Sequence, residues 1–376
     1  MTEAHSVNFL RKVLEIHLGW HGARLDFLAR FILALLQVRS VNLARLAPVL
    51  SSKAKISSNY IRLQRFFRGF HINQSDIART IVWLFPQKEP WILTLDRTNW
   101  KFGRIHINFL VLALVSHNFS LPLFWCALGK AGNSDTNERI MLMNRLRCCF
   151  PLQPIAYLLA DREFIGKKWF EALRDRNIPF RIRIKDNSKV FHRRKAGNYP
   201  LLREFQSLRI NEARILRQPR WLWGHQVFIS VKRLDVDEWL IVASEVYAPH
   251  ALVEYAQRWS IETLFAALKT HGFHLEDTHL TKPERLESLL GLLTLTTAWA
   301  LHTGIWAHAQ QPIRHKKTLN RPQFSLFRYG LDVLQRVVAK IQSFGVQFLC
   351  LLGLLLDGEL LNLHESIPCK MHLVLP

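Results

Sequence analysis

Two aspartates stand out as residues that could bind a divalent metal ion. Asp96 follows the apolar run 91–95, and Asp161 follows the apolar run 155–160. Each carboxylate is therefore expected at the end of a buried strand, which is where sheet proteins commonly bind ligands. Either aspartate alone would be better explained as a helix cap or a turn residue. The two together suggest a shared site.

A third carboxylate, Glu262, lies on a segment with strong helical character. Tyr255, Arg258, Glu262 and Lys269 are separated by three, four and seven residues. At about 100° per residue, the other three side chains fall within roughly 40° of Glu262 on a helix. A carboxylate can bind a metal while the cations and the phenol hold phosphate oxygens beside it. A surface helix with an i, i+4 ion pair between Arg258 and Glu262 is the plain alternative.

The surrounding pattern predicts the elements that would position these residues. Strand-like runs occur at 92–95, 105–115, 121–125, 155–159 and 180–184. Helical patterns at about 137–147 and 165–176 separate the later runs. Strands in succession, followed by strands alternating with helices, indicate an α/β fold with a mixed sheet and helical cover. A long helix is expected to begin near Pro249 and to continue past Lys269.

Residues 1–88 are expected to form a basic helical domain, because they combine helical periodicity with 13 Lys and Arg against 4 Asp and Glu. Within them, the segment 57–59 could cap a helix that displays Arg62, Arg65 and Arg68, with Gln64 nearby. Such a face could enter a DNA groove. A solvated helix face explains the same arginines equally well.

The segment 186–247 is predicted to be a β-rich, net basic insertion with 11 Lys and Arg against 7 Asp and Glu. The expected organisation is then a helical domain, a first core part, the insertion, a second core part that carries Glu262, and a helical C-terminal region. Their bounds are 1–88, 89–185, 186–247, 248–310 and 311–376. The apolar stretches 287–308 and 344–356 are interrupted or short for a membrane span and are interpreted as buried helices.

Charge and composition favour a nucleic acid as the partner. The chain has 51 Lys and Arg against 29 Asp and Glu, a net charge of +22, and so large a charge repels itself unless a polyanion accepts it. Five cysteines without disulfide or zinc-ligand spacing favour a reducing cytoplasm. His271, His274 and His279 lack a matching partner segment, and a zinc site is not expected there.

The pattern Tyr255-x2-Arg258-x3-Glu262-x6-Lys269 resembles the Y-x2-R-x3-E-x6-K signature of DDE transposases in the insertion-sequence-4 family. Asp96 in Leu-Asp-Arg-Thr-Asn-Trp and Asp161 in Ala-Asp-Arg-Glu-Phe resemble the two aspartate motifs of that family. The resemblance covers about 90–310. It implies an RNase H-like core in which these two aspartates and Glu262 hold two Mg²⁺ or Mn²⁺ ions about 3.5–4 Å apart.

The resemblance also implies residues that contact DNA. Tyr255, Arg258 and Lys269 would contact phosphates near the element end. Several transposases of the family form a DNA hairpin with a base flipped onto an aromatic side chain, for which Trp259 is one candidate. The insertion offers three further candidates: Trp221, Trp223 and Trp239. Core packing is the more common fate of a tryptophan.

The sequence thus predicts a bacterial cut-and-paste DDE transposase that acts on double-stranded DNA, both transposon ends and target, in the cytoplasm at the nucleoid and without a membrane. Apolar helices around 331–356 would supply the contact of a homodimer, as the resemblance suggests. Two alternatives stay open: a catalytically inactive DNA-binding regulator, and an RNase H-like nuclease that cuts without joining strands.

Overall fold

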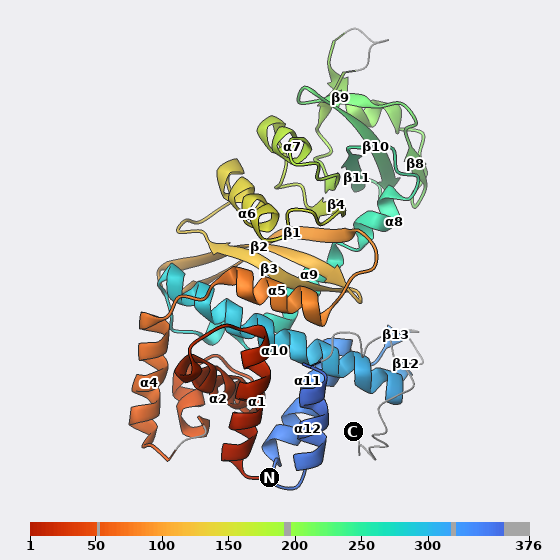
Figure 1. Ribbon diagram of the computed structural model, residues 1–376. Helices are drawn as coiled ribbons and strands as arrows, with labels where there is room; N and C mark the ends of the chain where they lie inside the picture. Colours follow the sequence, from red (N-terminus) through yellow and green to blue (C-terminus); the bar gives the residue numbers. More distant parts are fainter. Residues whose placement is uncertain (51–52, 192–196, 317–320, 357–376) are drawn as a thin grey trace. The chain divides into compact units, whose positions relative to one another are not determined.

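A computed structural model describes residues 1–50, 53–191, 197–316 and 321–356 (Figure 1). The described residues fall into two compact units. The first unit lies within 1–86, 99–107 and 264–376, and it is mainly helical. The second unit comprises 87–98 and 108–263, and most of the strands lie in it.

A nine-stranded mixed sheet organises the second unit. Its first five strands are β1 (Trp91–Phe102), β2 (Ile105–Ser116), β3 (Phe119–Ala127), β4 (Ile155–Ala160) and β5 (Phe180–Arg183). They stand in the order β3-β2-β1-β4-β5. β1, β4 and β5 are parallel, and β2 is antiparallel to β3. This arrangement confirms the predicted mixed sheet and is consistent with an RNase H-like core.

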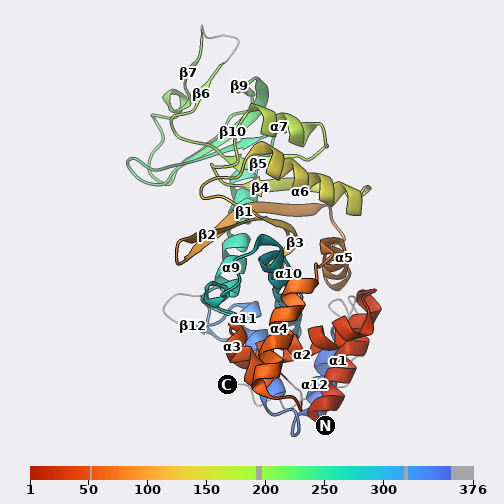
Figure 2. The same cartoon turned by 90° about the vertical axis from the view of Figure 1, so that its left-hand side faces the viewer.

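The segment 186–247 is β-rich, as predicted, and its longer strands continue the main sheet. The strands are β6 (Lys189–Val190), β7 (Tyr199–Pro200), β8 (Ala213–Ile215), β9 (Arg220–Leu222), β10 (His225–Arg233) and β11 (Trp239–Ser244), with a 3₁₀ turn at Leu201–Glu204. β11 pairs with β5, β10 with β11, and both β8 and β9 with β10. β6 and β7 form a separate two-stranded sheet (Figure 2).

Three helices of the second unit pack on its strands. α6 (Thr136–Cys149) contacts β3 and α7 (Lys167–Arg174), and α8 (Ala251–Ala256) contacts β5, β10 and β11. α6 begins with a capping box, in which Asp135 accepts a hydrogen bond from the Glu138 amide and Glu138 accepts one from the Asp135 amide. This box fixes the end of the 128–135 loop, which connects β3 to α6.

The first unit is a helical assembly around α10 (Pro283–Gln310). Its other helices are α1 (Glu3–His17), α2 (Gly22–Val38), α3 (Leu43–Leu46), α4 (Ile56–Gly69), α5 (Gln74–Leu84), α11 (Leu326–Ala339) and α12 (Gly345–Gly353). Short 3₁₀ turns occur at Ala47–Val49 and Leu275–Asp277, and β12 (His315–Lys316) pairs with β13 (Arg321–Pro322). α2, α4, α5 and α11 all pack against α10.

α10 is long and apolar enough by composition to cross a membrane, and the bent pair α2 with 43–49 passes the same test. However, 94% of the apolar window of α10 is buried inside the structure, as in the core helix of a globular unit. The prediction that 287–308 forms a buried helix is confirmed. At its crossing with α11 the two backbones touch, because a Cβ atom on Gly330 would lie 1.8 Å from the Ala300 carbonyl oxygen.

The structure corrects three local predictions. α4 begins at Ile56 after Lys55, so 57–59 lie in its first turn, and the Asn59 amide instead donates to the buried carbonyls of Ala47 and Leu50. The long helix expected from Pro249 is broken: α8 ends at Ala256, and α9 runs from Trp259 to Leu268. β1 does not end before Asp96 but continues to Phe102.

Candidate active site

The sheet register brings the two aspartates to neighbouring positions. Leu95 on β1 lies opposite Ala160 on the parallel strand β4. Asp96 and Asp161 are the next residues on the two strands, so both carboxylates come from adjacent backbones at the same level of the sheet. Asp161 directly follows the end of its strand, as predicted, whereas Asp96 lies in the middle of a longer one.

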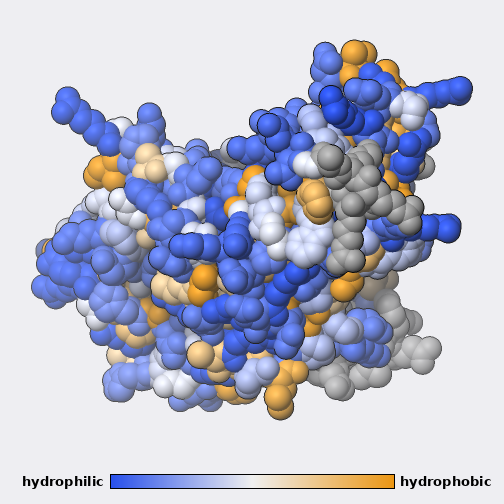
Figure 3. Space-filling view, turned by 90° about the horizontal axis from the view of Figure 1, so that it is seen from above, coloured by the Kyte–Doolittle hydropathy of each residue, from blue (hydrophilic) through white to orange (hydrophobic). Residues whose placement is uncertain are grey.

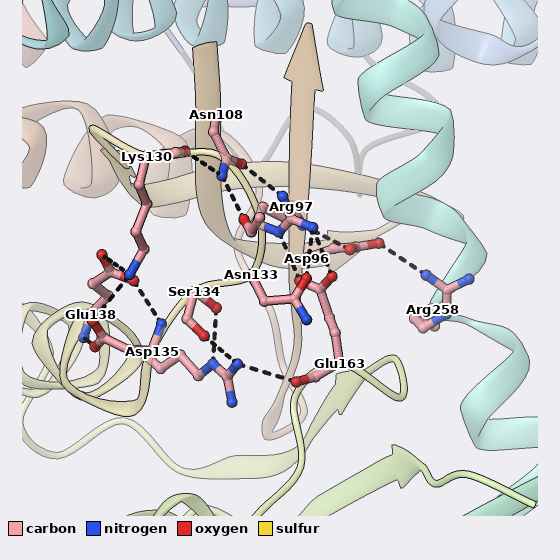
Figure 4. Close-up of polar contacts among 12 residues, drawn as sticks. Asp96, Arg97, Asn108, Lys130, Asn133, Ser134, Asp135, Glu138, Glu163 and Arg258 are labelled. Carbon is pink, nitrogen blue, oxygen red and sulfur yellow. Dashed lines mark hydrogen bonds and ion pairs between the residues drawn. The ribbon is translucent and has the colours of Figure 1, made fainter. Parts of the chain in front are cut away.

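Arg258 connects Asp96 to the third predicted carboxylate. One guanidinium nitrogen of Arg258 donates to Asp96 Oδ2 at 3.0 Å (Figure 4), and another donates to Glu262 Oε1. Arg258 lies in the turn between α8 and α9, where its amide donates to the Tyr255 carbonyl. The break between the two helices therefore does not separate Arg258 from Glu262. Both carboxylates share one cation.

The electrostatic environment of Asp96 shifts its pKa strongly. Burial raises its pKa to about 6, and the neighbouring carboxylates of Glu163 and Asp161 also raise it. The Arg97 amide, which donates to Asp96 Oδ1 at 2.7 Å, and the Arg258 guanidinium act in the opposite direction. Carboxylates that crowd together in a buried place are stabilised in their charged form by any cation that binds them.

The donor set fits a hard divalent cation. Asp161 Oδ1 is buried and accepts no hydrogen bond within the described residues, so one carboxylate oxygen has no protein partner. All three predicted ligands offer oxygen only, which suits Mg²⁺ or Mn²⁺ better than zinc. In the described part of the chain, no three His, Cys, Asp or Glu side chains lie together in an arrangement that could hold a metal ion without rearrangement. Asp96 and Glu262 turn oxygens toward Arg258 instead.

Tyr255 supports the site from within the core. It is buried against Leu159 and Val242, and burial raises the pKa of its hydroxyl above the usual value. The Arg258 guanidinium lies 5.9 Å from the centre of its ring. Burial acts to lower the pKa of Arg258, but Tyr255, Asp96 and Glu262 together raise it, so the guanidinium stays charged. Tyr255 thus presents little surface to a ligand.

The predicted DNA contacts differ in their accessibility. Trp259 is 66% exposed at the start of α9, and Arg65 is exposed on α4. Arg62 is partly buried and pairs with Asp26 at 3.0 Å. Lys269 lies in the first unit, where its ammonium pairs with Glu276 at 2.8 Å and donates to the Asn99 carbonyl at 2.9 Å.

Two of the insertion tryptophans line a pocket of about 440 Å³. Its lining residues are Lys189, Phe191, Asn198, Trp221, Trp223 and Gly224. Trp239 is half-buried, with the Arg233 guanidinium 5.1 Å from its ring centre. The face in Figure 3 is mostly hydrophilic, with apolar side chains in small scattered groups.

Sequence reasoning missed a polar network beside the aspartates. Arg97 forms a two-point ion pair with Glu163, and Asn108 and Asn133 also accept hydrogen bonds from Arg97 (Figure 4). The only signal in the sequence is proximity, because Arg97 follows Asp96 directly and Glu163 lies two residues after Asp161.

Comparison with known proteins bears on the same region. Residues 87–299 match the family model described as transposase DDE domain, which is more than half of the chain. No curated protein matches. A cryo-EM structure of the piggyBac transposase synaptic complex with hairpin DNA is similar, with a TM-score of 0.46 and 12% sequence identity over 92% of this chain and 79% of that chain.

Proposed function

This chain belongs to the transposase DDE domain family, and we propose that it is a cut-and-paste transposase of the insertion-sequence-4 type. It would cleave the ends of its own element and join them to target DNA. The observation that carries this proposal is the placement of Asp96 and Asp161 on adjacent parallel strands, with Glu262 tied to Asp96 through Arg258. A bacterial cytoplasm and a homodimer on DNA belong to the same proposal.

The three carboxylates would hold two Mg²⁺ or Mn²⁺ ions. Bound ions of this kind lower the pKa of an attacking water or 3′-hydroxyl and stabilise the leaving oxygen at phosphorus. Asp161 would offer its unpartnered Oδ1. Asp96 and Glu262 would turn the oxygens that now accept from Arg258, and the freed guanidinium would then be available to a DNA phosphate. Tyr255 would hold Arg258 in place from the core side.

The remaining contacts would position double-stranded DNA. Arg65 offers an exposed cation to a phosphate, and Lys269 would offer one if its ammonium left Glu276. Such contacts fix register but carry little sequence information. Trp259, exposed at the start of α9, could stack on an unpaired base. Trp221 and Trp223 line a pocket that offers a second place for such a base. The net charge of +22 makes a polyanionic partner favourable for the whole chain.

The decisive experiment measures cleavage of a labelled element end with Mg²⁺ and with EDTA. Asp96→Asn, Asp161→Asn and Glu262→Gln should each abolish cleavage while DNA binding persists, because each removes a charged metal ligand at nearly constant volume. Asp237→Asn is a matched control, since Asp237 is an exposed carboxylate of the same unit on the turn between β10 and β11. Substantial cleavage by any one of the three variants would remove that residue from the metal site.

The same experiment separates the alternatives. Joining of cut ends to a target plasmid would support a transposase. Metal-dependent cleavage without joining would instead indicate a nuclease. Specific binding to the element end without cleavage, under any divalent ion, would indicate a DNA-binding regulator.

A further inference from the structure

The ion pair between Arg97 and Glu163 joins the two segments that carry the aspartates. Arg97 Nε donates to Glu163 Oε1 at 3.0 Å, and a second guanidinium nitrogen donates to Oε2 at 3.0 Å. The side chains are only 12% and 21% exposed. A two-point contact of this kind fixes orientation as well as distance.

Each partner is anchored on its own side. Glu163 lies in a turn closed by the hydrogen bond from the Phe164 amide to the Asp161 carbonyl, and its own carbonyl accepts from Arg139 at 3.1 Å. Arg139 is buried on α6, with its guanidinium 4.9 Å from the Phe164 ring centre. The turn after Asp161 is therefore held by both its backbone and its side chain.

On the other side, Arg97 is held by two asparagines. It donates to Asn108 Oδ1 at 3.0 Å and to Asn133 Oδ1 at 3.1 Å. The Asn108 amide in turn donates to the carbonyls of Lys130 and Gly132 in the loop before α6 (Figure 4). Arg97 thus connects β1, β2, this loop and the turn after β4.

We propose that Arg97 and Glu163 are positioning residues that hold Asp96 and Asp161 at the separation required for metal binding. The proposal rests on the metal-dependent function proposed above. The covalent path Asp96–Arg97, the ion pair, and the path Glu163–Arg162–Asp161 form a second connection between the aspartates besides the β1–β4 ladder. Residues that orient metal ligands in this way typically change metal affinity or activity by about 10- to 100-fold when they are removed.

Glu163 is assigned a positioning role and not the role of a ligand because the single guanidinium of Arg97 holds both of its carboxylate oxygens, whereas the two oxygens of Asp96 accept from two different residues. Asp161 Oδ1, in contrast, has no partner in the described chain. Arg97 thereby also pairs with a fourth carboxylate beside the three that would hold the ions. This makes the two roles separable by experiment, since removing Arg97 would release Glu163.

The test is the binding of Mn²⁺ to the full-length protein without DNA, measured by the loss of the free Mn²⁺ signal in electron paramagnetic resonance. Arg97→Ala, Glu163→Ala and the double variant are each expected to bind Mn²⁺ about 10-fold more weakly than the wild type. The double variant should be little worse than either single one, because both remove the same connection. Arg97→Lys should bind Mn²⁺ about as weakly as Arg97→Ala, since a lysine ammonium cannot make the two-point contact of a guanidinium.

Arg220→Lys is the matched control, because Arg220 forms a two-point ion pair with Glu204 in the same unit at 10% and 11% exposure. It should lower thermal stability but leave Mn²⁺ affinity unchanged. An equal loss of affinity in this control would overturn the proposal, because general destabilisation would explain both results. Weaker binding in Glu163→Ala without any change in Arg97→Ala would also overturn it and make Glu163 a ligand.

The wild type distinguishes this inference from the proposed function. Wild-type protein that binds no Mn²⁺ would overturn the proposed function, and the inference with it. Wild-type binding that all the Arg97 and Glu163 variants retain in full would overturn the inference alone.

Discussion

Substitution of Arg65 or Arg68 on α4 is expected to reduce the salt dependence of DNA binding, whereas substitution of Arg62 is not. Arg65 and Arg68 are exposed, and neither makes an ion pair or hydrogen bond within the described residues. Arg62 instead donates to Asp26 at 3.0 Å and lies 5.9 Å from the ring centre of Phe27. Its guanidinium is therefore held against the helical unit by Asp26, which Arg30 also contacts.

The magnitude follows from counterion release. Each phosphate contact contributes about 0.9 to the slope of log affinity against log salt concentration. Raising the salt concentration fourfold, from 50 to 200 mM, lowers the affinity of the wild type by some factor. Loss of one phosphate contact should make that factor about 3.5-fold smaller in the variant. The double variant of Arg65 and Arg68 should make it about 12-fold smaller. Arg62→Ala should leave the slope unchanged and cost a little stability, because Asp26 would lose one of the two arginines that pair with it in the described structure.

The measurement is fluorescence anisotropy of a labelled duplex titrated with full-length protein at several KCl concentrations. Arg62→Ala serves as the control, since it removes the same side chain from the same helix. A slope that falls as much for Arg62→Ala as for Arg65→Ala would refute the reasoning, because exposure and pairing would then not decide which arginine meets phosphate. Unchanged slopes for all three arginines would remove α4 from the DNA interface.

Three further substitutions test other parts of the structure. Trp259→Ala should change the free energy of unfolding by no more than about 0.5 kcal/mol, because the ring is 66% exposed. It should nevertheless slow a step in which a base is unpaired. Unchanged single-turnover rates would exclude this role. Tyr255→Phe should retain the fold because its ring packing is kept, and lower DNA affinity or cleavage only through Arg258; normal kinetics would show that the hydroxyl is dispensable. Gly330→Ala should destabilise the protein by about 1–3 kcal/mol or more, since its Cβ would lie 1.8 Å from a carbonyl of α10. Gly69→Ala, with open space around it, should not, and equal melting temperatures for the two variants would contradict the packed crossing.

The parts that sequence could predict are those that depend on local pattern. The apolar runs before Asp96 and Asp161 become β1 and β4, and their parallel pairing places the two carboxylates at one level. The buried strands β2 and β3 are nearly continuous apolar runs, which their length and aromatic and β-branched residues identify as strands.

The break before Glu262 could not be predicted in this way. α9 begins at Trp259, and the buried hydroxyl of Ser260 is hydrogen-bonded to that of Ser120 on β3 at 2.7 Å. This contact joins residues 140 positions apart, so it cannot be predicted from the helical periodicity around Glu262. Tertiary contacts override a local helix preference at such a point. The ion pair between Arg97 and Glu163 could not be predicted for the same reason, since 66 positions separate the two residues.

The same distinction applies to the arginines of α4. Spacing alone assigned Arg62 and Arg65 to one DNA-facing surface. The buried residues Leu63, Phe66 and Phe67 define the face that packs inward, and Arg62 lies beside that face. Sequence can supply the period of a helix, but its inward direction depends on the helices that pack against it.

Sequence-specific recognition should also depend on α4, and the structure determines how this can be tested. Residues 1–86 fold in one unit with 264–356, and α10 packs against α2, α4 and α5. A deletion of 1–88 would expose the apolar surface of α10, so point substitutions in the full chain are the sound test. Ser57 is exposed and Gln64 is half-buried on α4, and neither carries a charge. Uncharged side chains can read bases where arginines mainly hold phosphates.

Gln64→Ala is therefore expected to reduce the preference for element-end DNA over scrambled DNA by about 1–3 kcal/mol, or roughly 5- to 150-fold, if its amide reads a base edge. The salt slope should stay the same because no charge is removed. Ser57→Ala should have a smaller effect of the same kind, since a hydroxyl offers a weaker and less selective contact than an amide. Both affinities are measured at one fixed salt concentration. A full preference retained in the double variant would place specific recognition outside α4, because an outward helix face that read bases could not lose both polar side chains without cost.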